Sequence, residues 1–90
     1  FTAFIGILLT KSNRTQEVLK ELSSIPNVIE ASVISGKYNI FCKVKAKNTD
    51  DAKRIIYQID DIQDVMRTES MISMEEYLSD KNRLIKAITI

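Results

Sequence analysis

Few residues in this 90-residue chain could catalyse a reaction. The sequence has no His and one Cys, so it offers no Ser–His or Cys–His pair and no imidazole for zinc or haem. Asp60 with Asp61 and Glu75 with Glu76 are adjacent acid pairs. Glu75 and Glu76 would diverge on a strand, and the aspartates are expected to be solvated at a helix end. We therefore expect no enzyme activity, no metal and no cofactor.

The remaining candidates suit binding rather than catalysis. Gly36 and Lys37 separate two strand-like stretches, and Gly36 is expected to take a positive φ in a tight two-residue hairpin. A glycine there also lets a ligand approach the backbone amides. A simple turn followed by two solvated residues, Tyr38 and Asn39, would explain the same pattern. This turn is nevertheless the best candidate for a ligand-facing edge.

Three lysines follow the turn at the two-residue period of a strand, namely Lys43, Lys45 and Lys47. They are typical of a solvated strand edge that resists aggregation, and a stripe for nucleic acid is the alternative. The net charge of the chain is only +1. No field of the whole molecule therefore favours nucleic acid or an anionic membrane.

Length and composition indicate one small globular domain. The chain is 44% apolar and 28% charged, as in ordinary globular proteins. Association with another copy commonly stabilises so short a chain. The longest apolar run, residues 3–9, is far shorter than the roughly 20 residues that cross a bilayer. The lone Cys42 is expected to be buried and unreactive, and it fits a reducing cytoplasm.

Apolar periodicity predicts two β-α-β halves. The expected strands are 2–9, 28–35, 38–47 and 65–74. One helix is expected between Asn13 and Pro26, and a second is expected to begin at an Asn48 cap. Residues 83–90 could form a fifth strand or a short helix, and the β-branched residues near the C-terminus favour the strand.

This order predicts an α+β, ferredoxin-like βαββαβ sandwich, in which two helices cover one face of a four-stranded antiparallel sheet. In the third strand, the residues expected to face the helices are Tyr38, Ile40, Cys42, Val44 and Ala46. The opposite face would expose an apolar patch that includes Phe41, so we expect a second copy to cover it, sheet face to sheet face. The domain is expected to span 1–76, with 77–90 as an extension on the same domain or its partner.

Four short stretches carry a resemblance to a known family. They are residues 3–7, 18–28, 36–44 and 65–70. The third contains Gly-x-Tyr, a polar residue and an apolar run that ends in Lys-Val, and the fourth reads Val-x-x-Thr-x-Ser. Together, in this order and spacing, they are fairly specific. Over residues 2–76 the chain resembles the RAM domain of the Lrp/AsnC, or feast/famine, transcription regulators.

The resemblance implies a homodimer, often assembled into a ring of dimers, that binds an amino acid or related metabolite between subunits. It implies effector-binding roles for Gly36, Tyr38, Asn39, Thr68 and Ser70, and modulation of transcription by oligomerisation. The family's Asp after Gly-x-Tyr is Asn39 here, which lacks the charge to pair with an ammonium group.

The chain resembles the stand-alone type that lacks a helix-turn-helix domain, or else it is a domain excised from a longer regulator. We therefore expect no direct contact with DNA and no membrane partner. One alternative is an oligomerisation module without a small ligand that pairs with a full-length Lrp/AsnC regulator. The other is an RNA-binding module, since the RRM shares this order of elements but needs aromatic residues on its first and third strands.

Overall fold

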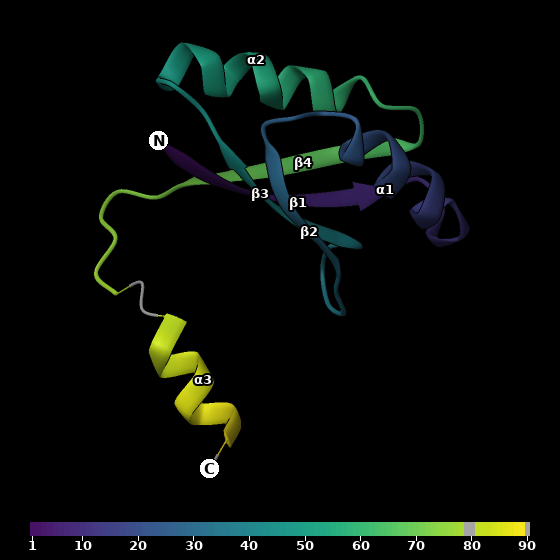
Figure 1. Ribbon diagram of the computed structural model, residues 1–90. Helices are drawn as coiled ribbons and strands as arrows, with labels where there is room; N and C mark the ends of the chain where they lie inside the picture. Colours follow the sequence, from purple (N-terminus) through teal and green to yellow (C-terminus); the bar gives the residue numbers. More distant parts are fainter. Residues whose placement is uncertain (79–80, 90) are drawn as a thin grey trace.

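The computed structural model describes residues 1–78 and 81–89 (Figure 1). The elements are β1 (Thr2–Leu9), the 3-10 turn η1 (Ser12–Arg14), α1 (Thr15–Ser23), β2 (Val28–Val33), β3 (Ile40–Lys45), α2 (Thr49–Asp60), β4 (Val65–Ile72) and α3 (Lys81–Thr89). The strands form one antiparallel sheet in the order β2-β3-β1-β4, and α1 and α2 lie on one side of it. The predicted ferredoxin-like sandwich is confirmed.

The core lies between the sheet and these two helices. Alternate residues of the central strands are buried there, namely Ala3, Ile5, Ile7 and Leu9 from β1 and Ile40, Cys42 and Val44 from β3. The helices contribute Val18 and Leu22 from α1 and Ile55 and Ile59 from α2. Burying each large aliphatic side chain stabilises the fold by about 1.5–3 kcal/mol before the entropic cost of ordering it. The predicted inward direction of Ile40, Cys42 and Val44 is therefore confirmed.

The hairpin between β2 and β3 is longer than predicted. Strand β2 ends at Val33 and β3 begins at Ile40, so residues 34–39 form a loop instead of a two-residue turn. The backbone N–H of Ile34 donates to the carbonyl of Asn39 at 3.1 Å and closes this loop. Gly36 has a φ of 109°, which confirms its predicted positive φ. The prediction of a tight turn was wrong, because the chain leaves the β2–β3 hydrogen-bond ladder before Gly36 and rejoins it only after Asn39.

The C-terminal segment differs from the favoured prediction and forms the short helix that the sequence left as the alternative. Residues 81–89 form the helix α3 and not a fifth strand, and β4 ends at Ile72 instead of residue 74. In Figure 1, α3 stands apart from the sheet, beyond an irregular stretch after β4. A strand needs a neighbour for its backbone hydrogen bonds, whereas a helix forms these bonds within itself. The β-branched residues near the C-terminus therefore did not predict the secondary structure of this segment correctly.

Within residues 1–78 and 81–89, the helices are too short and too polar to cross a membrane.

Candidate functional site

The candidate site is built on Asn39, which joins the hairpin loop to the end of β1. Its backbone N–H donates to the carbonyl of Ile7 at 2.9 Å. Its side-chain Oδ1 accepts the backbone N–H of Leu9 at 2.8 Å. The side-chain oxygen is therefore engaged within the fold, which leaves the Nδ2 group to donate to a ligand. An Asp at this position could accept the same bond from Leu9.

Tyr38 lies on the face of the sheet opposite the helices, which we call the open face. A Cβ added to Gly6 would come within 2.9 Å of the Tyr38 ring, so the ring fills the space above Gly6. The hydroxyl of Tyr38 donates to the Glu69 carboxylate on β4. The prediction that Tyr38 faces the helices was wrong, because the loop breaks the alternation between Tyr38 and Ile40.

Thr68 and Ser70 lie on the other face of the sheet, towards the helices. In the register they pair with Ile7 and Ile5, whose side chains are buried under the helices. The Thr68 hydroxyl donates to the Asp60 carboxylate at 2.6 Å, and Asp60 is the last residue of α2. The expectation that Asp60 is merely solvated overlooked this contact.

The five predicted residues thus surround one end of the sheet without forming a single pocket in one chain. Asn39 and Thr68 flank Ile7 from opposite sides, about 10 Å apart at two strand spacings. Tyr38 lies on the open face, and Gly36 is exposed in the hairpin loop. A ligand touching all five would have to bridge both faces of the sheet.

This end of the sheet is held together by Asp64, which the sequence reading missed. The Thr10 backbone N–H donates to the carbonyl of Asp64 at 2.9 Å, and Arg14 Nε donates to its carboxylate at 2.8 Å. The hydrogen bond to Asp64 and the nearby Glu17 carboxylate raise the pKa of the Arg14 guanidinium. Asp64 has a φ of 75°, a backbone conformation that costs most residues free energy. The end of β1 is therefore tied to the start of β4.

The open face carries an aromatic pair with charged neighbours. The rings of Phe4 and Phe41 stack with centroids 5.9 Å apart and planes 14° apart. Lys43 Nζ lies 5.9 Å from the Phe4 ring centroid and 4.0 Å from the Glu30 carboxylate. A depression of about 510 Å³ adjoins this pair and reaches Ser32 on β2. The open face is therefore apolar at its centre and charged towards its edge.

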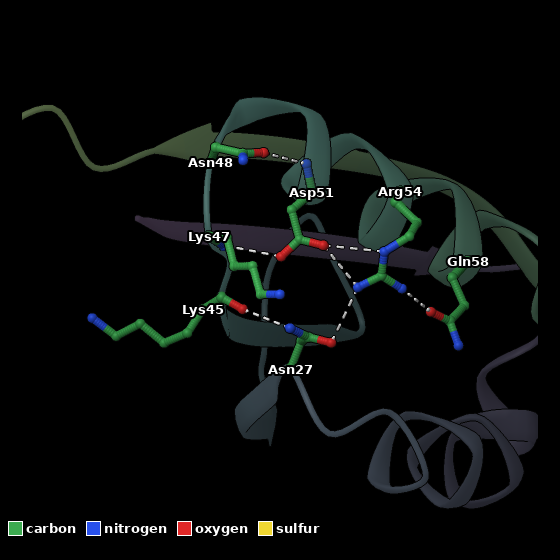
Figure 2. A network of polar contacts seen from close by, with 7 residues as sticks. All are labelled: Asn27, Lys45, Lys47, Asn48, Asp51, Arg54 and Gln58. Carbon is green, nitrogen blue, oxygen red and sulfur yellow. Dashed lines mark hydrogen bonds and ion pairs between the residues drawn. The ribbon is translucent and has the colours of Figure 1, made fainter.

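A polar network at the start of α2 was only partly predicted (Figure 2). The Asp51 backbone N–H donates to Asn48 Oδ1 at 2.9 Å, which confirms the Asn48 cap. The Asp51 carboxylate accepts the Lys47 backbone N–H at 2.9 Å and two Arg54 nitrogens at 2.9 and 3.1 Å. The N–H of Lys47 and the guanidinium of Arg54 hold the pKa of the Asp51 carboxyl below its usual value. Arg54 also reaches Asn27, which precedes β2.

Cys42 is 1% exposed, as the sequence predicts. Burial raises the pKa of its thiol from 9.0 to about 11. The thiol therefore stays protonated at neutral pH and is a poor nucleophile. Among the described residues, no three His, Cys, Asp or Glu side chains converge in a way that could hold a metal ion.

Comparison with known proteins identifies relatives along most of the chain. A family model described as the Lrp/AsnC ligand binding domain matches residues 2–83. Regulatory protein AsnC of Haemophilus influenzae is 34% identical over 73 residues, which cover 80% of this chain and 49% of that protein. The chain spans about half the length of the curated relatives it matches.

Solved structures share the fold. The structure of Escherichia coli AsnC matches with a TM-score of 0.84 and 30% identity, over 88% of this chain and 54% of that one. A feast or famine regulatory protein from Mycobacterium tuberculosis, solved in complex with L-methionine, matches with a TM-score of 0.77 over 89% of this chain and 54% of that one. Its 20% identity shows likeness of fold alone.

Proposed function

Because the chain belongs to the Lrp/AsnC ligand-binding domain family, we propose that it binds a small effector, an amino acid or related metabolite, at a subunit interface. Binding would modulate transcription in the cytoplasm by changing how the protein assembles. The observation that carries the proposal is the position of Asn39 and Thr68 on either side of Ile7, at one end of the sheet. The fold neighbour solved with L-methionine supports an amino acid as the class of ligand.

The polar groups at this end of the sheet suit a small zwitterion. Asn39 Nδ2 is a donor for a carboxylate or amide oxygen. The Thr68 oxygen is an acceptor, because its proton is donated to Asp60, and the Ser70 hydroxyl can donate and accept. Gly36 would allow a ligand or a second subunit to approach the loop backbone, since no atom of the described residues beyond residues 35–37 lies within 4 Å of a Cβ added there. These groups belong to both faces of the sheet, so a second subunit would be needed to complete the site.

The open face supports a homodimer joined sheet to sheet. Phe4, Phe41 and the Tyr38 ring lie on this face. Met71, which is 42% exposed, lies there too, opposite Phe4 in the register. Covering such a surface is a common reason for association. Further assembly into a ring of dimers would bring other surfaces together around the candidate site.

Thermal unfolding with each of the twenty protein amino acids tests the effector. A ligand that binds only the folded state raises the Tm, by an amount that grows with its concentration relative to Kd. We expect one or a few amino acids to do so, and Asn39→Ala to weaken the response more than Lys47→Ala does. Lys47 is the matched control because its side chain is exposed and its structural bond comes from the backbone. A greater loss of the Tm response for Lys47→Ala than for Asn39→Ala would show that the proposed site is in the wrong place.

The alternatives predict different results. An oligomerisation module that pairs with a full-length Lrp/AsnC regulator would respond to no amino acid, but would change mass when mixed with such a regulator. The stacked Phe4 and Phe41 on the two central strands also fit the aromatic platform of an RNA-binding sheet. Binding to RNA oligomers that weakens steeply with salt would favour that function.

A further inference from the structure

A group of hydrogen-bond acceptors lies where α2 ends above β4. Asp60 is the last residue of α2, and its Oδ1 accepts the Thr68 hydroxyl at 2.6 Å. Ser70 follows two residues later on the same face of β4, and it is exposed. Because Thr68 donates its only hydroxyl proton to Asp60, the Thr68 oxygen can only accept a hydrogen bond from a ligand.

The electrostatic environment of this end of α2 is negative. The last turn of the helix contains no basic residue, and Asp61 directly follows Asp60. The C-terminal carbonyls of a helix add partial negative charge of their own. Among the described residues, the ion pairs of the structure involve other carboxylates, and Asp60 is exposed to solvent. This location therefore attracts a small cation.

An ammonium group matches these acceptors. It has three N–H donors, and the side chains of Asp60, Thr68 and Ser70 provide a carboxylate and two hydroxyl oxygens. The hairpin loop provides no such charge, because Asn39 is neutral and its Oδ1 already accepts from Leu9. We propose that Asp60 is the specificity-determining residue that binds the ammonium group of the effector. This inference rests on the proposed function, and it names the charge that selects an amino acid over an uncharged metabolite.

Titration calorimetry with the amino acid that gives the largest rise in Tm tests the role of Asp60. Asp60→Asn keeps an oxygen that can accept the Thr68 hydroxyl but removes the charge. The matched control is Asp61→Asn, which removes a neighbouring carboxylate at the same helix end. We expect Asp60→Asn to raise Kd by about tenfold or more, as for loss of a charge-assisted hydrogen bond, and Asp61→Asn by less than about threefold. Equal effects of the two variants would overturn the assignment.

A second measurement needs no variant and so does not depend on the stability of Asp60→Asn. The wild-type protein is titrated with the N-acetyl derivative of the same amino acid, which keeps the side chain and carboxylate but has no ammonium group. We expect binding to be lost, and equal binding of both compounds would overturn the role of Asp60. If no amino acid raises the wild-type Tm at all, the proposed function itself fails and the assignment falls with it.

Discussion

The ring of Tyr38 lies directly over Gly6, with Cδ2 2.9 Å from where a Cβ on Gly6 would be. This contact fixes the hairpin loop against the central strand and places the Tyr38 hydroxyl on Glu69 of the neighbouring strand. Because Asn39 is the next residue, the same contact also positions the candidate ligand-binding side chain. The glycine at position 6 is thus required by the aromatic ring above it and not by backbone conformation.

Replacing Gly6 by Ala should therefore displace Tyr38. We expect Gly6→Ala to lower the free energy of unfolding by about 1–3 kcal/mol, the usual cost of overpacking, in urea denaturation. Tyr38→Ala provides the space that the new methyl group needs. The cost of Gly6→Ala should fall below about 0.5 kcal/mol in that background, since the two residues are in contact. An unchanged cost would show that the ring does not limit position 6.

The cap of α2 should contribute measurable stability. Asn48→Ala removes the acceptor of the Asp51 backbone N–H, and such caps are worth about 1 kcal/mol. The control is Asn13→Ala, because Asn13 is an exposed residue within η1 and is the N-cap of neither η1 nor α1. Urea denaturation should show the loss for Asn48→Ala and a change below about 0.5 kcal/mol for Asn13→Ala. Equal losses would contradict the capping role shown in Figure 2.

Cys42 should make the fold sensitive to alkaline pH. Its pKa rises to about 11 in the folded state, so the folded protein holds the thiol proton more tightly than the unfolded chain does. The resulting stability is fully present below about pH 9 and is lost as pH rises to about 11. Cys42→Ala removes this dependence, although it also leaves a small cavity whose cost does not vary with pH.

The difference in Tm between wild type and Cys42→Ala should therefore shrink from pH 8 to pH 11. Other groups that titrate in this range are common to both proteins, so the difference isolates the thiol. A Tm difference that stays constant from pH 8 to pH 11 would mean that the folded protein does not disfavour the thiolate form of Cys42.

Phe41 should be essential for pairing of the open faces. Phe41→Lys places a charge next to Phe4 at the centre of the apolar surface, where a second copy is proposed to pack. We expect light scattering on a gel-filtration column to show a dimer for wild type and a monomer for the variant. Tyr57→Lys is the control, since Tyr57 is a 63% exposed aromatic residue on α2. A monomeric wild type, or a dimer for Phe41→Lys, would contradict the sheet-to-sheet arrangement.

Most of the fold could be predicted because its signals are local. The two-residue period that buries Ile40, Cys42 and Val44, and the helical stripe of α2, follow from residue spacing alone. The choice between a helix and a strand near the C-terminus could not be made from the sequence, because a short apolar segment becomes a strand only if a neighbouring strand is available. Whether a neighbouring strand is available depends on the folded structure and cannot be read from the local sequence.

The candidate site was harder to predict, because its contacts join residues far apart in the sequence. The spacing of residues in the sequence does not indicate the path of the loop, which turns Tyr38 to the open face. It also does not indicate that Asp60 approaches Thr68. Gly6 did carry a signal, since an isolated glycine inside a strand often marks close approach by another group. That signal indicates that some group lies close above β1, but not that the group is the Tyr38 ring.

The most direct test of the central claim is a crystal structure of the protein grown with the amino acid that raises its Tm most. The proposal predicts difference density for that amino acid at a subunit interface, bounded by the 34–39 loop and by Thr68 and Ser70. Its carboxylate or amide should lie near Asn39. Density enclosed by one chain alone, or at an interface that excludes both of these regions, would contradict the proposed site.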